Sequence, residues 1–195
     1  IKTKMHILKN VINFSNRIGI NKPKVAVLSA TEEVLDSVPS SKEASEITKL
    51  AKKDNLDADV FGPLAFDNSI SKKSALIKGI NNIVAGEADV LLVPSVETGN
   101  ALVKMLIYFC GACAAGVVIG GKVPVVITSR SDEAPARLAS IAAAVVALDW
   151  LFDWKKNYFA LNLKLMAIKY LKKSPKTSST DDTQTTEIVK NLLKE

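Results

Sequence analysis

The stretch VPVVITSRSDEAPARLAS, residues 123–140, contains the parts of an α/β unit in the order in which such folds use them. Its first five residues, Val123 to Ile127, suit a buried strand, and a polar segment follows them without transition. An alanine-rich segment with helical character then begins at Pro135. A strand that continues through a polar loop into a helix predicts an α/β fold.

The rest of the chain repeats this alternation. Helical spacing predicts helices over residues 4–18, 41–53, 71–84, 99–113 and 135–151. Apolar runs predict strands over residues 24–30, 57–66, 88–94, 115–121 and 123–129, the second of which breaks at Gly62-Pro63. In the first helix the expected buried stripe consists of Ile7, Val11, Phe14 and Ile18. Together these elements predict a three-layer α/β fold with a largely parallel sheet.

Composition and charge restrict the function. The 195 residues are 48% hydrophobic and 24% charged, which is typical of a packed globular domain or of two small lobes that share a cleft. The net charge of +6 is unevenly placed, because residues 1–150 have 17 Lys and Arg against 15 Asp and Glu, whereas residues 151–195 have 9 against 5. Residues 1–150 contain no arginine cluster and no zinc-ligand spacing, so we do not expect nucleic-acid binding.

Residues 151–195 differ in character from the α/β region of residues 1–150. A basic amphipathic helix is predicted by the helical spacing of Trp154, Tyr158, Leu161, Leu165 and Ile168 among lysines. Such a helix can bind a membrane surface, but we expect it to pack on its own domain or on a second subunit of a homo-oligomer. Residues 174–184 predict a linker, and residues 187–193 a short terminal helix.

An uncharged run from Met105 to Gly121 raises the question of a membrane span. Its four glycines favour turns and a covered sheet, so we expect no span. Cys110 and Cys113 form a C-x-x-C pair within this run, which could be redox-active or half of a metal site. We expect small buried thiols instead, because no second pair of ligands is present. Reduced thiols and the lack of a signal peptide predict a cytoplasmic location.

Polar loops follow three of the predicted strands, at residues 62–71, 94–100 and 128–136. Ligands of parallel sheets gather at the carboxyl ends of the strands, so we expect the ends of strands 90–93 and 123–127 to lie side by side, bringing Asn100 and Arg130 to one cleft. The last two loops contain Ser95, Glu97, Thr98 and Asn100, and Thr128, Ser129, Arg130 and Asp132. Hydroxyls, backbone N–H groups and a guanidinium are the groups that bind an oxyanion such as phosphate.

Purely structural roles stay open for the same residues. Ser129 could cap the helix that follows, Asp132 could complement the positive end of that helix, and Arg130 could be a solvated surface charge. The glycines form neither a P-loop nor a G-x-G-x-x-G fingerprint after a strand, so a nucleotide-hydrolase or dinucleotide-binding function is not indicated.

Several long motifs resemble the carboxyl-terminal half of the phosphate acetyl/butyryltransferases. They are KVAVLSATEEV, FGPLAFDNSIS, KGINNIVAGEADVLLVPSVETGN, GACAAGVVIGGKVPVVITSRSD and RLAS, which occur in this order between residues 24 and 146. The resemblance implies the reaction acyl phosphate + CoA ⇌ acyl-CoA + phosphate. It also implies a two-lobed fold similar to that of the isocitrate and isopropylmalate dehydrogenases, with much of the amino-terminal lobe having no counterpart here.

The resemblance also implies roles for the polar loop. Arg130 matches the family's phosphate-binding arginine and Ser129 its neighbour in the S-R motif, while Thr128 and Asn100 are further polar contacts. An aspartate after S-R would be the general base, for which Asp132 is the candidate. Acyl-CoA and phosphate are the expected small-molecule partners. Coenzyme A would be a substrate, and neither a metal nor another cofactor is expected.

One departure from the family pattern and two classes of function remain. Phe61 stands where the family usually has an aspartate before Gly-Pro. An acyltransferase is the first class, and a non-catalytic binding or assembly module that is a truncated relative is the second. A dehydrogenase of the same fold would need clustered metal-binding aspartates, which are not evident. The acetyl and butyryl substrates stay open, with the LAFDN and TSRSD motifs favouring the butyryl branch.

Overall fold

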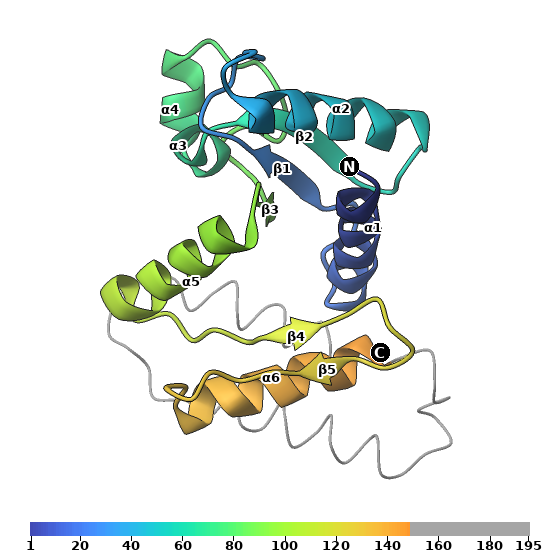
Figure 1. Ribbon diagram of the computed structural model, residues 1–195, viewed down its shortest axis with the longest axis vertical. Helices are drawn as coiled ribbons and strands as arrows, with labels where there is room; N and C mark the ends of the chain where they lie inside the picture. The colour runs from blue at the N-terminus through green and yellow to red at the C-terminus, as the bar shows by residue number, and fades with distance from the viewer. Residues whose placement is uncertain (149–195) are drawn as a thin grey trace. The chain divides into compact units, whose positions relative to one another are not determined.

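The computed structural model describes residues 1–148, so the helices and the linker predicted within residues 151–195 lie outside the described residues. The chain divides into two compact units, whose elements are drawn in Figure 1. Of the described residues, the amino-terminal unit comprises residues 1–16 and 20–110, and the carboxyl-terminal unit comprises residues 17–19 and 111–148.

The amino-terminal unit contains a parallel sheet of three strands in the order β2-β1-β3. The strands are β1 (Lys24–Leu28), β2 (Asp59–Leu64) and β3 (Val90–Leu92), and the helices are α1 (Lys2–Arg17), α2 (Pro39–Lys53), α3 (Phe66–Ile70), α4 (Lys72–Ile77) and α5 (Val96–Cys110). Val25 of the central strand β1 pairs with Val60 on one side and with Val90 on the other. This sheet confirms the predicted α/β class and its parallel pairing.

Both faces of the sheet are covered, because side chains of β1 alternate between two hydrophobic clusters. Val25 and Val27 belong to a cluster that also contains residues of α1 and α2. Ala26 and Leu28 belong to a second cluster with Leu64 of β2 and residues of α4 and the segment after it. This alternation explains why β1 is apolar at every position after Lys24.

The buried stripe of α1 is not the predicted one. Met5, Leu8, Ile12 and Ser15 are buried, whereas Ile7 is 46% exposed. The two sets are both spaced at three and four residues, so spacing alone did not decide between them. The observed set places the small Ser15 at the end of the packed face.

The carboxyl-terminal unit contains a two-stranded antiparallel pair, β4 (Val117–Val118) and β5 (Val125–Val126), and helix α6 (Ala134–Ala147). Both strands were predicted, but their membership of a parallel sheet was not correct. Parallel neighbours need a crossover of a dozen or more residues, whereas only residues 119–124 separate these strands. Gly120, at φ +102°, helps to reverse the chain within that short connection.

The structure also tests the predictions made for the uncharged run of residues 105–121 and for its two cysteines. No helix within residues 1–148 has the length and the apolar character that crossing a membrane requires. Cys110 and Cys113 are both exposed free thiols, so the prediction of buried thiols was wrong. The reason is that α5, which ends at Cys110, contributes no buried residue.

Candidate functional site

The polar segment after β5 forms a tight turn closed by Asp132. The Asp132 carboxylate accepts the backbone N–H of Ser129 at 2.7 Å, and the Asp132 N–H donates to the Ser129 carbonyl at 3.1 Å. The hydroxyls of Ser129 and Ser131 lie 3.0 Å apart. Arg130 therefore occupies a central position of a four-residue turn whose two ends are tied together.

The side chains of this turn differ in exposure. Arg130 and Thr128 are exposed, whereas Ser129 and Asp132 are half-buried. Among the described residues Arg130 makes no ion pair. A fixed backbone with an unengaged guanidinium is suited to binding an anion from solution.

Arg137 is a second guanidinium at the turn and was missed from the sequence. Its Nε donates to the Asp132 carbonyl at 3.0 Å, from the first turns of α6. The only available signal was its position five residues after Asp132, which does not by itself distinguish a site residue from a solvated helix residue.

The amino end of α6 adds unpaired donors beside the turn. Its N-cap residue is Glu133, whose side chain makes no capping hydrogen bond, and Pro135 lies in the first helical turn. Ser129 is therefore not the cap of this helix, which removes one of the structural alternatives. The uncapped amino end carries the positive part of the helix dipole.

Asn100 lies on α5 in the amino-terminal unit and is exposed. The loop before it is ordered by Ser95, whose Oγ accepts the Thr98 N–H at 3.3 Å. A hydrogen bond from its own backbone N–H and one from Ser95 lower the pKa of Glu97. Because Asn100 and Arg130 belong to different units, their meeting in one cleft, and the neighbouring ends of their strands, stay predictions.

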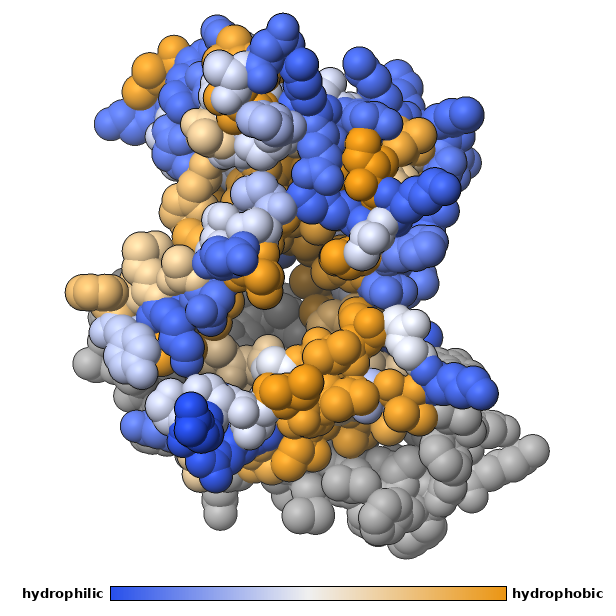
Figure 2. All heavy atoms as spheres, in the orientation of Figure 1, coloured by the Kyte–Doolittle hydropathy of each residue, from blue (hydrophilic) through white to orange (hydrophobic). Residues whose placement is uncertain are grey.

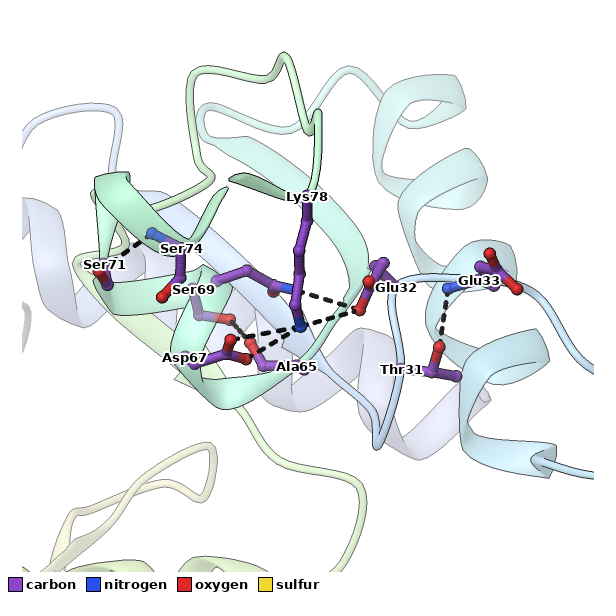
Figure 3. Close-up of polar contacts among 10 residues, drawn as sticks. Thr31, Glu32, Glu33, Ala65, Asp67, Ser69, Ser71, Ser74 and Lys78 are labelled. Carbon is purple, nitrogen blue, oxygen red and sulfur yellow. Dashed lines mark hydrogen bonds and ion pairs between the residues drawn. The ribbon is translucent and has the colours of Figure 1, made fainter. Parts of the chain in front are cut away.

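A second polar cluster lies at the carboxyl ends of β1 and β2 and was not predicted. Figure 3 shows Lys78 reaching between Glu32 and Asp67, with its Nζ 3.3 Å from an oxygen of each. The Asn68 amide donates to the same Glu32 oxygen at 3.2 Å. Asn68 is fully buried, and its Oδ1 has no hydrogen-bond partner within the described part of the chain.

Opposing effects act on the Lys78 ammonium. Desolvation lowers its pKa, but the hydrogen bonds that it donates to Asp67 and Glu32 and the charges of both carboxylates raise it, so that the net pKa lies above the usual value. Lys78 is therefore a cation at neutral pH and can hold the loops after β1 and β2 together. Glu32 and Lys78 are 46 positions apart in the chain, which explains why local sequence gave no signal for this pair.

The sequence of this chain is similar to those of known proteins. The family model described as "Phosphate acetyl/butaryl transferase" matches residues 2–145. A phosphate acetyltransferase from Rhizobium meliloti is 46% identical over 147 residues, which are 75% of this chain and 46% of that protein. A probable phosphate butyryltransferase from Bacillus subtilis (strain 168) is 42% identical over 142 residues, which are 72% of this chain and 48% of that protein.

A solved structure of a related protein has a similar fold. It is a branched-chain phosphotransacylase from Enterococcus faecalis V583, with a TM-score of 0.70 and 37% sequence identity over 75% of this chain and 53% of that chain. The chain thus spans about half the length of the curated relatives that it matches.

Proposed function

Because this chain belongs to the phosphate acetyl/butaryl transferase family, we propose that the protein exchanges an acyl group between coenzyme A and phosphate. The family match over residues 2–145 and the names of the relatives support this activity. The proposal includes a cytoplasmic location, acyl-CoA and phosphate as the small-molecule partners, and no further cofactor. The lobed fold of the isocitrate and isopropylmalate dehydrogenases stays a prediction.

The observation that supports the proposed site best is the turn closed by Asp132 around Arg130. In the proposed mechanism Arg130 binds two phosphate oxygens through its planar fork, and the Ser129 hydroxyl donates a third hydrogen bond. Thr128 and Asn100 provide further polar contacts. Charge neutralisation by groups already held in place lowers the barrier to the departure of phosphate.

In the direction of acyl-CoA formation, the coenzyme A sulfur attacks the acyl carbon of the acyl phosphate. The carbon–sulfur bond forms, the carbon–oxygen bond to phosphate breaks, and phosphate leaves with the electron pair. The thiol must lose its proton, and a thiol with a pKa of about 8.5 is only a few per cent ionised at neutral pH. We propose that Asp132 acts as the base that accepts this proton. Its Oδ2 accepts the Ser129 N–H, and no hydrogen-bond partner of its Oδ1 is found within residues 1–148.

Replacement of Arg130 in the full-length protein tests this site. Arg130→Ala removes both charge and fork, and Arg130→Lys keeps only the charge. Release of free CoA thiol from acyl-CoA in the presence of phosphate should fall about a hundredfold or more for the alanine variant, and less for lysine. Lys122→Ala, at an exposed lysine between β4 and β5, is the matched control. A folded Arg130→Ala protein within about threefold of the parent rate contradicts the assignment.

We also propose that the protein is a homo-oligomer and prefers butyryl-type acyl chains. Support for an oligomer comes from α5, which buries none of its residues within the described chain and exposes Tyr108 (68%) and Phe109 (86%). Figure 2 shows a further apolar area over β4 and β5, where Val118, Val123, Val125 and Ile127 are exposed. Large exposed apolar patches mark interaction sites.

The same exposed surfaces favour the second candidate, a non-catalytic assembly module. The two candidates differ in the parent protein itself. A folded full-length protein that forms oligomers but releases no CoA thiol with either acetyl-CoA or butyryl-CoA would support the module and overturn the enzyme.

A further inference from the structure

A groove of about 470 Å³ lies along the outer edge of β2, within the amino-terminal unit. Its walls come from the end of α2, including Lys52 and Asn55, and from the segment that contains Asn82 and Ile83. Its floor is formed by Val60 and Phe61 of β2. We call it the β2 groove. Its volume is within the range of ligand sites, and none of the residues assigned to acyl transfer lines it.

The floor of the groove offers one unpaired backbone unit. Within the described residues β2 pairs with β1 alone, so its other edge is free. The Asp59 N–H points inward, donating to the Pro23 carbonyl at 3.0 Å. Because backbone groups of successive strand residues point to opposite edges, the N–H and the carbonyl of Val60 point outward into the groove.

Two neighbouring outward groups are already engaged. The Gly62 carbonyl accepts the Thr48 hydroxyl at 3.1 Å, and the Ala58 N–H donates to the Leu56 carbonyl at 2.8 Å. Pro63 has no N–H to offer. An added β-strand would need several free groups in succession, so this edge is too short for a peptide. It presents one donor and one acceptor side by side, which fits the edge of a flat heterocycle.

The walls supply apolar surface and positive charge. Phe61 is half-buried and Ile83 is 60% exposed, so both have surface available to a ring. Lys52 makes no ion pair within residues 1–148, whereas Lys22 is held 2.9 Å from Asp59. Asn82 accepts the Val84 N–H through its Oδ1 at 2.9 Å, which orients its amide donors away from that bond. The groove therefore combines a ring-sized apolar space with an available cation.

We propose that the β2 groove binds an adenine nucleotide. The adenine amino group donates to the Val60 carbonyl, the adjacent ring nitrogen accepts the Val60 N–H, and a phosphate lies against Lys52. The same chemistry occurs in a free nucleotide such as AMP and at the adenosine end of coenzyme A. Arg130 does not line the groove, so binding of AMP there does not require the proposed phosphate site.

Calorimetric titration of the full-length protein with AMP tests the proposal. Lys52→Glu should weaken AMP binding at least tenfold, while Lys53→Glu, at the adjacent exposed lysine outside the groove, should leave it unchanged. Ile83→Asp, at a surface position, should weaken it as well. Adenosine and ribose 5-phosphate should each bind more weakly than AMP, because each lacks one of the two recognised parts.

Further arms identify the source of the nucleotide and separate this site from the catalytic one. Displacement of AMP by coenzyme A but not by pantetheine assigns the groove to the adenosine end of the substrate, and simultaneous binding of both assigns it to a free nucleotide. Arg130→Ala should not alter AMP binding even if it abolishes turnover. Failure of the folded parent to bind AMP at millimolar concentration, or equal binding by the parent and Lys52→Glu, overturns the proposal.

Discussion

Ser140 of α6 is hydrogen-bonded to Gly116, the residue that precedes β4. Its Oγ accepts the Gly116 N–H at 3.0 Å and donates to the Ala136 carbonyl at 2.8 Å, and the residue is only 1% exposed. One hydroxyl thus connects the helix of the carboxyl-terminal unit to its strand pair.

Ser140→Ala should remove the hydrogen-bond acceptor of the exposed Gly116 N–H. We expect a loss of about 0.5–1.5 kcal/mol in the free energy of unfolding, together with faster amide hydrogen exchange at Gly116. Chemical denaturation and exchange measured by NMR check the two effects. Ser131→Ala, at an exposed serine, is the control, and equal exchange at Gly116 in both variants would contradict this role of Ser140.

Gly62→Ala should destabilise the sheet, because β1 leaves no room for a side chain there. A Cβ at this position would lie 2.5 Å from the Val27 carbonyl oxygen and 2.8 Å from the Val27 Cβ. Overpacking of this kind costs about 1–3 kcal/mol or more, which urea denaturation would measure. Gly121→Ala is the comparison, since its nearest contact would be at 3.6 Å. Equal stability of the two variants would show that β1 and β2 can separate easily.

Glu87 should stabilise the fold in a pH-dependent manner. Hydrogen bonds from Lys24 and Lys72, and their charges, lower the pKa of Glu87 to about 2, from a usual value of 4.5. A depressed carboxylate pKa contributes stability that is fully present above about pH 4.5 and is lost as the pH falls toward 2.

The melting temperature of Glu87→Gln should therefore be below that of the parent at pH 7, and the difference should shrink between pH 4.5 and 2. Glu46→Gln, at an exposed glutamate without an ion pair among the described residues, should show no such trend. A difference that stays constant down to pH 2 would mean that Glu87 acts through packing and not through its charge.

Asp132→Asn separates the two roles of this residue in the proposed mechanism. The asparagine oxygen can still accept the Ser129 N–H, so the turn should persist, but the base is lost. Acyl-CoA formation should slow about ten- to a hundredfold at pH 7 and recover as the pH approaches the thiol pKa of about 8.5. Parent-like rates at pH 7 would contradict the role of Asp132 as a base and would support only its structural role in the turn.

The elements that sequence predicted well are those whose apolar pattern admits one interpretation. Residues 25–28 are all apolar, so side chains on both faces of this strand are apolar. They belong to the central strand β1, and all four are buried. The family resemblance seen between residues 24 and 146 was also confirmed, since long ordered motifs do not arise from composition. The phosphate-binding roles of Ser129, Arg130 and their neighbours remain predictions.

The parts that could not be predicted depend on partners distant in the chain. An apolar run indicates a strand but not its neighbour, so the antiparallel pairing of Val117 with Val126 was not visible in the pattern. Lys78, Glu32 and Asp67 are brought together by the order of the strands and not by their spacing. Cys110 sits in an apolar run, yet it is exposed because α5 has no covering element within the described residues.

The position of β1 in the middle of its sheet has a consequence for synthesis on the ribosome. Val25 pairs with Val90, so one edge of β1 has no partner until β3 has left the exit tunnel. Until then the sheet is incomplete, and the backbone N–H and carbonyl groups on that edge of β1 are exposed. Other nascent chains can pair with these groups. The pair β4 and β5 needs only a short connection and can close as soon as residue 126 emerges. Pauses in translation before residue 90 should therefore promote aggregation more than pauses after it.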